Sequence, residues 1–373
     1  MRHYKKDKSG HIYKSQKCKF TSLSIMFKAG TLYEPDGKKG ISHLMEHLIC
    51  KTVQEYDDKF INDCIEFNAV TSIDYVEFYF RGLSSKLTRE LKQELVRKLL
   101  GGLDITQEIL NTEKEIVKQE ILDSFEDPFE GNILNCYYKY YNLVDPGGFI
   151  EDVESVTLED VQQMYNTVFL RPLRIVEVGH ERSDFSFVTY EEKLPVPVEI
   201  RYKKSKREMM PVNNGDKSNI YVLTKKVASK NHYKYLAIGL NMLLDGFNSP
   251  FMQEIREKRG LSYYIHGEIL QVVDKSIIWF YASTDKENAE QLKSVFNDLC
   301  KNVRQYLTKE RFNLALDHIK TQREIQKLFL WKNTTKYTEY EHACILERLE
   351  RLNYDRLVGV VEKYLYNTFI VEF

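Results

Sequence analysis

Regular spacings of apolar residues divide the chain into two stretches that each mix strands and helices. Residues 20–28 and 75–80 alternate apolar and polar positions, which is typical of strands with one buried face. From Leu87 to Leu99 a leucine recurs at every fourth position, which predicts a helix that a Gly-Gly pair ends. The first stretch also predicts helices at about 41–52, at about 105–124 and from Thr157, with Asp160 as capping partner, and a strand at 173–179.

Residues 185–217 interrupt this regularity with three prolines, a basic run and an Asn-Asn-Gly turn, so we expect a linker region there. The second stretch then predicts strands near 219–224, 263–270, 276–283 and 368–372, and helices near 232–245, 249–258, 287–304 and 308–330. The sequence therefore predicts an α+β fold of two similar α/β sandwich domains, each a mostly antiparallel sheet with helices packed on it. The expected domains are residues 1–185 and 218–373, joined by residues 186–217.

Composition narrows the possible functions without choosing one. The chain has 373 residues, of which 43% are hydrophobic, and its formal net charge is −1. This balance excludes a global attraction to nucleic acid or to an anionic membrane, and no apolar run is long enough to cross a bilayer. The polar N-terminus lacks the apolar core of a secretory signal, and the six cysteines are scattered without a Cys-x-x-Cys pair. We therefore expect a cytoplasmic protein with reduced thiols.

The segment His43-Leu44-Met45-Glu46-His47 carries the clearest chemistry of the chain. In a helix, positions i, i+3 and i+4 share one face, so both imidazoles and the carboxylate point into the same space. Two such histidines can bind one zinc ion, and Glu46 can take a proton from a metal-bound water. The order is the inverse of the commoner zincin motif. A chance cluster on a helix surface is the alternative.

A tetrahedral catalytic zinc needs a third protein ligand, which must come from elsewhere in the chain. In the helix predicted near 105–124, Glu113 and Glu120 fall on the apolar stripe, two turns apart. Carboxylates on the inward face of a helix are costly unless a cation meets them. Alone, both could be solvated glutamates at a helix edge. Beside the histidine motif, they are candidates for the third ligand and a supporting group.

A family resemblance begins at the histidine motif. Residues 40–47, Gly-Ile-Ser-His-Leu-Met-Glu-His, resemble the motif of the pitrilysin family of zinc metallopeptidases, which includes insulin-degrading enzyme and mitochondrial processing peptidase. The resemblance implies that His43, His47 and Glu120 bind the zinc ion. It also implies that Glu46 is the catalytic base and that Glu113 supports the site from beside Glu120.

Two further segments extend the resemblance. Residues 67–72, Phe-Asn-Ala-Val-Thr-Ser, look like the family's substrate-edge segment before a strand, where Asn68 and Ala69 are expected to hold an extended peptide by backbone pairing. Residues 251–263 resemble a signature of the second domain, in which an arginine and a tyrosine seven residues apart reach the substrate. Arg256 and Tyr263 fit that spacing, although by themselves they would be a helix-end arginine and a core or strand tyrosine.

The sequence departs from the family pattern in three places. The stretch before residue 20 is short and lacks the usual opening strand and turn. After His47, Leu-Ile-Cys-Lys-Thr replaces the more usual aromatic and glycine, and the chain is short for a two-domain member. We expect these departures to affect the substrate range and not the metal site.

The resemblance implies a half-length, two-domain zinc endopeptidase. It is expected to hydrolyse peptides or unfolded segments in a chamber made by two subunits, in peptide maturation, leader removal or general turnover. A homodimer is expected, and a catalytic subunit that needs an inactive homologue is the alternative. A peptide-binding scaffold without turnover is another. A structural zinc domain needs four ligands, and no fourth is evident, although Cys50 lies one turn beyond Glu46 and His47.

Overall fold

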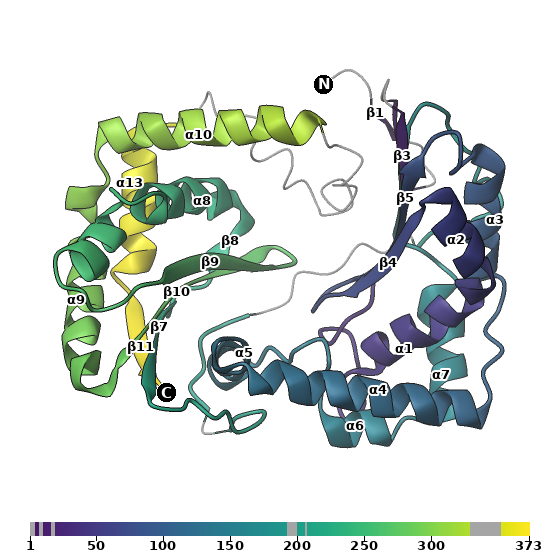
Figure 1. Ribbon diagram of the computed structural model, residues 1–373, viewed down its shortest axis with the longest axis horizontal. Helices are drawn as coiled ribbons and strands as arrows, with labels where there is room; N and C mark the ends of the chain where they lie inside the picture. The colour runs from purple at the N-terminus through teal and green to yellow at the C-terminus, as the bar shows by residue number, and fades with distance from the viewer. Residues whose placement is uncertain (1–3, 7–9, 16–18, 192–199, 206, 329–351) are drawn as a thin grey trace. The chain divides into compact units, whose positions relative to one another are not determined.

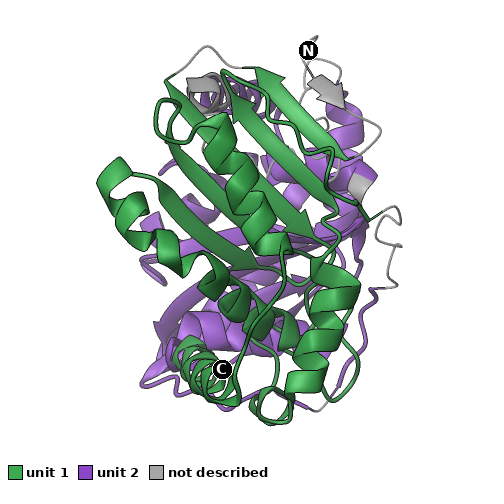
Figure 2. Ribbon diagram, turned by 90° about the vertical axis from the view of Figure 1, so that its right-hand side faces the viewer, with its two compact units in different colours: residues 1–124, 143–196, 328–341 green, residues 125–142, 197–327, 342–373 purple. Residues whose placement is uncertain are grey.

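The computed structural model describes residues 4–6, 10–15, 19–191, 200–205, 207–328 and 352–373. The described residues form two compact units, shown in green and purple in Figure 2. The first unit takes in the described parts of 1–124, 143–196 and 328–341, and the second those of 125–142, 197–327 and 342–373. The domain boundaries predicted at residues 185 and 218 stay a prediction. Residues 192–199, which hold two of the three prolines of the predicted linker, and residue 206 of its basic run lie outside the described residues.

The first unit is built on a six-stranded sheet in the order β1-β2-β6-β3-β5-β4. All pairs are antiparallel except β2 with β6, which run parallel. Helices α1, α2, α3 and α7 lie along the same side of this sheet in Figure 1. The elements are β1 (Tyr4–Lys6), β2 (His11–Ser15), β3 (Phe20–Phe27), α1 (Ile41–Cys50), η1 (Lys51–Tyr56), α2 (Asp57–Asp63), β4 (Glu66–Thr71), β5 (Val76–Leu83), α3 (Arg89–Leu100), α4 (Gln107–Glu126), α6 (Ile150–Glu154), α7 (Leu158–Met164), η2 (Tyr165–Phe169) and β6 (Arg174–Gly179).

Strand alternation explains how this sheet meets its helices. Leu23 pairs with Phe80 and Ile25 with Phe78 across β3 and β5, and all four side chains are buried. Because side chains alternate along a strand, the same face of the edge strand β4 carries Phe67, Ala69 and Thr71. Phe67 stacks on Phe80, with ring centroids 4.7 Å apart. The helix that carries the histidine motif therefore packs beside a strand whose other edge is open among the described residues.

The opening of the chain corrects one expectation. The stretch before residue 20 was expected to lack the usual opening strand, but β2 pairs in parallel with β6, His11 opposite Ile175 and Ser15 opposite Gly179. The partner strand lies far away in the sequence, so local alternation carries no sign of the pairing. Most of residues 67–72 belongs to strand β4, which lies at the edge of the sheet and directly before strand β5 in the chain.

The second unit is built on a five-stranded sheet in which every pair is antiparallel. Its path is β11-β7-β10-β8, with β9 paired to β10. The elements are α5 (Pro128–Tyr141), β7 (Lys217–Thr224), β8 (Ala228–Ser229), α8 (Lys230–Leu244), η3 (Met252–Glu257), β9 (Ile265–Val272), β10 (Lys275–Asp285), η4 (Lys286–Asn288), α9 (Ala289–Lys301), η5 (Val303–Tyr306), α10 (Lys309–Leu328), α13 (Tyr354–Leu365) and β11 (Thr368–Glu372).

Both faces of the second sheet are covered. Ile220, Val222 and Phe280 belong to an apolar core that includes residues of α8, α9 and α13. On the other face lies α5, where Tyr221 Oη donates to the Phe129 carbonyl at 2.7 Å. The predicted α+β fold of two antiparallel-type sheets with packed helices is confirmed. Among the described residues, no helix has both the length and the apolar character needed to cross a membrane.

Candidate metal centre

Helix α1 begins at a point that two neighbouring groups fix. Gly40 takes φ 100°, and a Cβ at this position would lie 2.2 Å from the Gly147 carbonyl oxygen, so only glycine fits. The buried Glu34 carboxylate accepts hydrogen bonds from the backbone N–H groups of Gly40 and Ser42, both at 2.7 Å. It occupies the place of a capping side chain at the positive end of the helix. Burial raises the pKa of Glu34, despite these hydrogen bonds.

The first turns of α1 then separate apolar from polar side chains. Leu44, Met45 and Leu48 are fully buried against the sheet. His43 and His47 lie on another face and are partly exposed, and their rings approach edge to face with centroids 4.9 Å apart. The apolar side chains thus hold the helix while both imidazoles remain accessible.

The structure brings both histidines to Glu120 of α4. The Oε2 atom of Glu120 lies 3.3 Å from His43 Nε2 and 3.5 Å from His47 Nε2. Among the described residues, these three form the one group of metal-binding side chains whose ligand atoms can lie mutually within 4.8 Å. Glu120 keeps 46% of its side-chain surface exposed, so the group opens to solvent.

This donor set fits a zinc ion. Ligand atoms about 2.0–2.1 Å from a tetrahedral zinc stand about 3.3 Å from one another, which is close to the two N–O distances that Glu120 makes with the histidines. Two imidazoles and one carboxylate leave the fourth tetrahedral position open, as catalytic zinc sites require. Cys50 lies outside the group, and burial raises the pKa of its thiol to about 12.

The charges of the site also favour a cation. Burial lowers the pKa of His43, but the hydrogen bond to Glu120 and the charges of Glu46, Glu120 and Asp145 outweigh it and raise the pKa overall. The hydrogen bond to His43 lowers the pKa of Glu120. The surrounding carboxylates therefore stabilise positive charge at the point where the three donors meet.

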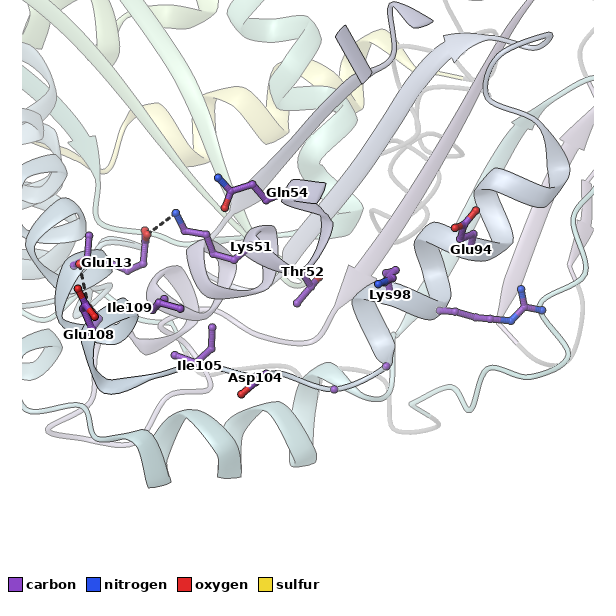
Figure 3. Close-up of a pocket in the computed structure, with 14 residues that line it drawn as sticks. Lys51, Thr52, Gln54, Glu94, Lys98, Asp104, Ile105, Glu108, Ile109 and Glu113 are labelled. Atoms are coloured by element: carbon purple, nitrogen blue, oxygen red, sulfur yellow. Dashed lines mark hydrogen bonds and ion pairs between the residues drawn. The ribbon is translucent and has the colours of Figure 1, made fainter. Parts of the chain in front are cut away.

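Glu113 stands behind His47. Its Oε2 lies 3.1 Å from His47 Nδ1, and its side chain is only 4% exposed. Its second oxygen, Oε1, forms an ion pair with Lys51 Nζ at 2.9 Å, drawn as a dashed line in Figure 3. Lys51 and Glu113 also line a cavity of about 800 Å³ between the end of α1, helix α3 and the start of α4. Sequence reasoning missed Lys51, whose signal is its position four residues after His47.

A hydrogen bond from a residue of the sheet fixes the Glu46 side chain. Thr71 Oγ1, on the helix-facing side of β4, donates a hydrogen bond to Glu46 Oε2. The hydrogen bond from Thr71 does not involve the other carboxylate oxygen of Glu46, Oε1. A cavity of about 340 Å³ adjoins the site and is lined by Glu46, His47, Cys50, Lys51, Gln54, Asp57, Phe67 and Glu113. Sequence reasoning missed the role of Thr71, although it included the residue in the substrate-edge segment.

The predicted peptide-binding residues lie at the free edge of the first sheet. Strand β4 pairs with β5, and no described residue pairs with its other edge. The backbone N–H of Ala69 donates to the Asn68 side-chain oxygen at 2.8 Å. This edge N–H is therefore occupied by a neighbouring side chain and not by the sheet.

Arg256 and Tyr263 lie together in the second unit. The Arg256 guanidinium lies 4.5 Å from the centre of the Tyr263 ring, and Tyr263 is 80% exposed. Arg256 sits in the π-helical turn η3, and its guanidinium also lies 5.3 Å from the centre of the exposed Phe247 ring. The expected pair is thus a surface cation–π contact, and Phe247 is a third member that sequence reasoning missed.

Two family models match the chain. The model described as "Insulinase (Peptidase family M16)" matches residues 12–143, and the one described as "Peptidase M16 inactive domain" matches residues 181–318. The first match contains both histidines, Glu46 and Glu120, and the second contains Arg256 and Tyr263.

Similar proteins agree in fold and in part of the sequence. The zinc protease PqqE of Helicobacter pylori is 22% identical over 289 residues, which are 70% of this chain and 64% of that protein, so the match spans less than two thirds of its length. A probable mitochondrial-processing peptidase subunit beta of Arabidopsis thaliana is 22% identical over 158 residues, or 40% of this chain and 29% of that protein. The crystal structure of a protease from Helicobacter pylori has the same fold, with a TM-score of 0.77 at 18% identity over 99% of this chain and 98% of that chain.

Proposed function

Since the chain belongs to the M16 family of insulinase- and pitrilysin-like zinc proteases, we propose that it is itself a zinc-dependent endopeptidase. One observation carries the proposal: His43, His47 and Glu120 bring one ligand atom each within 4.8 Å of one another, and the carboxylate of Glu46 stands on the same helix face. In this proposal His43, His47 and Glu120 hold the ion, and Glu46 is the catalytic base.

The chemistry follows from these roles. Held by His43, His47 and Glu120, a zinc ion would lower the pKa of a bound water to about 7 and would polarise the carbonyl of the scissile peptide. Glu46 accepts a proton from the attacking water and then donates it to the leaving amine. Thr71 holds one oxygen of Glu46, which directs the other toward the water. Glu113 fixes the ring of His47 through Nδ1.

We propose that the peptide binds as an added strand on β4. The edge N–H of Ala69 is bonded only to the Asn68 side chain in the described structure, and a side chain can turn away when a peptide carbonyl takes its place. Main-chain pairing of this kind requires an extended segment, so peptides and unfolded segments are the expected substrates. Peptide maturation and leader removal are the uses we propose, in the cytoplasm.

The proposed assembly is a homodimer in which Arg256 and Tyr263 of one subunit contact the substrate at the metal centre of the other. The chain carries both the metal motif and this pair, so a two-fold dimer would hold two complete sites. A heterodimer with an inactive homologue is the alternative, because the relative from Arabidopsis thaliana is a subunit of a processing peptidase. In a third possibility, the protein binds peptides without hydrolysing them.

Metal analysis combined with peptide cleavage tests the function. The purified protein should contain one zinc per chain and cleave members of a mixed peptide library, and a chelator should abolish cleavage until zinc is restored. His43→Ala and Glu120→Ala should lose most of the zinc. Glu115→Ala is the matched control, because Glu115 lies on the same helix but pairs with Lys118 on the surface. Full zinc in both ligand variants would reject the site, and bound zinc without cleavage of any peptide would favour the scaffold.

Complementation tests the shared site. Glu46→Gln and Tyr263→Phe chains, each weakly active alone, should regain activity after subunit exchange, because a mixed dimer contains one site with neither change. No gain, despite verified exchange and a clear defect in both parents, would exclude this arrangement while leaving the zinc assignment untouched.

A further inference from the structure

The carboxylate that supports His47 has a second partner on its far side. Glu113 places Oε2 3.1 Å from His47 Nδ1 and Oε1 2.9 Å from Lys51 Nζ. Lys51 follows His47 by one helical turn, so the end of α1 presents a ligand and a cation to the same carboxylate. We propose that Lys51 is a positioning residue of the metal centre, which holds Glu113 so that His47 is aimed at the ion. This inference rests on the proposed zinc site and adds a residue that acts on His47 through Glu113.

Burial makes the second partner necessary. The Glu113 side chain is 4% exposed, so an oxygen without a partner would face the cost of a desolvated charge. With Lys51 on Oε1, the plane of the carboxylate is fixed and Oε2 stays opposite His47 Nδ1. Without Lys51, the carboxylate could turn or take up a proton, and the imidazole would lose its fixed acceptor. Orientation of the ligand is what such outer partners supply to metal sites.

The two ligand histidines differ in this support. His43 Nδ1 is buried, and no described residue forms a hydrogen bond with it. His47 Nδ1 has the Glu113–Lys51 pair behind it. The geometry of the site therefore depends on the His47 side, where His47 Nδ1 and Lys51 Nζ each face an oxygen of Glu113.

Simple electrostatics predicts the opposite effect of removing Lys51. A lysine near a site for a divalent cation repels that cation, so loss of its charge alone should strengthen zinc binding. A positioning role predicts weaker binding instead. The sign of the change in zinc affinity thus separates the two roles.

The test is competition for zinc between the protein and a chelator, measured for the parent chain and three variants. Lys51→Met should raise the zinc Kd by about 10–100-fold, the usual range for loss of an outer partner. Lys51→Arg, which keeps the cation, should stay close to the parent. Lys98→Met is the matched control, because Lys98 lines the same cavity (Figure 3) but pairs with Glu55. Its Kd should be unchanged or slightly lower.

A second readout follows the geometry of the site. With Co²⁺ in place of zinc, the visible spectrum of Lys51→Met should differ from that of the parent, and the spectrum of Lys98→Met should not. An unchanged or lower zinc Kd in Lys51→Met would overturn the inference while leaving the metal site intact. Equal weakening in Lys51→Met and Lys98→Met would also overturn it, as a general charge effect. A parent chain that binds no zinc would refute the proposed function as well.

Discussion

Two clusters in the first unit combine histidine, carboxylate and lysine, yet only one of them resembles a reaction centre. The open cluster consists of His43, His47, Glu113, Glu120 and Lys51. The closed cluster consists of His11, Lys92, Glu177 and Ser183. Both occupy the helix-covered side of the same sheet, and both draw their members from distant parts of the chain.

The closed cluster satisfies its charges internally. Lys92 forms an ion pair with Glu177 Oε1 and donates to the Glu181 carbonyl at 3.2 Å. Ser183 donates through its backbone N–H at 2.9 Å and through its hydroxyl at 2.7 Å to the two oxygens of Glu177. His11 Nε2 lies 3.4 Å from Glu177 Oε2, and all four residues are buried.

The open cluster instead brings the ligand atoms of His43, His47 and Glu120 within 4.8 Å of one another. These are two imidazole nitrogens and a half-exposed carboxylate oxygen, and the lysine stands behind them on Glu113. In the closed cluster the lysine lies at the centre and neutralises the carboxylate, whereas in the proposed metal site the lysine lies outside the three ligands. The placement of the lysine makes the difference.

The largest expected effect separates catalysis from structure at the open cluster. Glu46→Gln should lower kcat by about 10²–10⁴-fold, the usual contribution of a general base. Zinc content and thermal stability should match the parent, because the amide keeps the shape of the side chain. Glu115→Gln on the surface of α4 is the control and should retain full activity. Parental cleavage rates in Glu46→Gln would mean that another group takes the proton.

The closed cluster should respond in stability. Lys92→Met leaves the buried Glu177 charge without its cation and should cost about 3–5 kcal/mol of unfolding free energy in urea titrations. The folded fraction should still bind one zinc per chain. Adding Glu177→Leu should recover most of the loss, because it removes the unpaired charge. A variant that kept its stability but lost zinc would erase the distinction between the clusters.

Substitution of Thr71 should have a smaller effect, which is confined to kcat. Thr71→Val keeps the shape of the side chain but removes the hydrogen bond to Glu46, and bonds to charged groups contribute about 1.5–3 kcal/mol. The expected loss in kcat is about 10–100-fold, with KM and zinc content unchanged. Thr71→Ser should restore most of the rate. A loss that appears in KM alone would assign Thr71 to peptide binding.

The smallest expected effect is on the pH dependence of stability. Burial works to raise the pKa of Glu177, but His11 and Lys92 lower it below its usual value. A depressed folded-state pKa gives stability that is present above the unfolded pKa, about 4.3, and is lost as pH falls through the folded value. The Lys92→Met/Glu177→Leu double variant should therefore show a shallower loss of stability below about pH 4.3 than the parent. Unfolding titrations of the chelated proteins at several pH values measure this slope, and identical slopes would contradict the assigned shift.

The sequence predicted those parts of the site that a single helix determines. His43, Glu46 and His47 share a face because of helical spacing, and the apolar stripe of α4 singled out Glu113 and Glu120. The stripe predicted two inward carboxylates, and the structure buries Glu113 while leaving Glu120 half exposed. That difference depends on neighbours that helical spacing alone does not reveal.

The residues and elements that were missed depend on contacts between distant segments. Lys51 meets Glu113 only because α1 and α4 pack together, and Thr71 meets Glu46 only through the register of β4. Strand β2 is short and finds its partner in β6. Helix α5 has clear capping signals in Asp127 and Pro128, and sequence reasoning missed it.

The contact between Asn68 and Ala69 has a consequence for solubility. An unpaired strand edge can recruit the edge of another copy of the same chain and so begin aggregation. At β4, the Asn68 side chain occupies an N–H that such a copy would need, and Glu66 adds a charge two residues away on the exposed face. An incoming strand must displace this local contact before it can pair. The contact therefore disfavours pairing of this edge with another copy of the chain. A segment can still pair with β4 if its further contacts are strong enough to displace the Asn68 side chain.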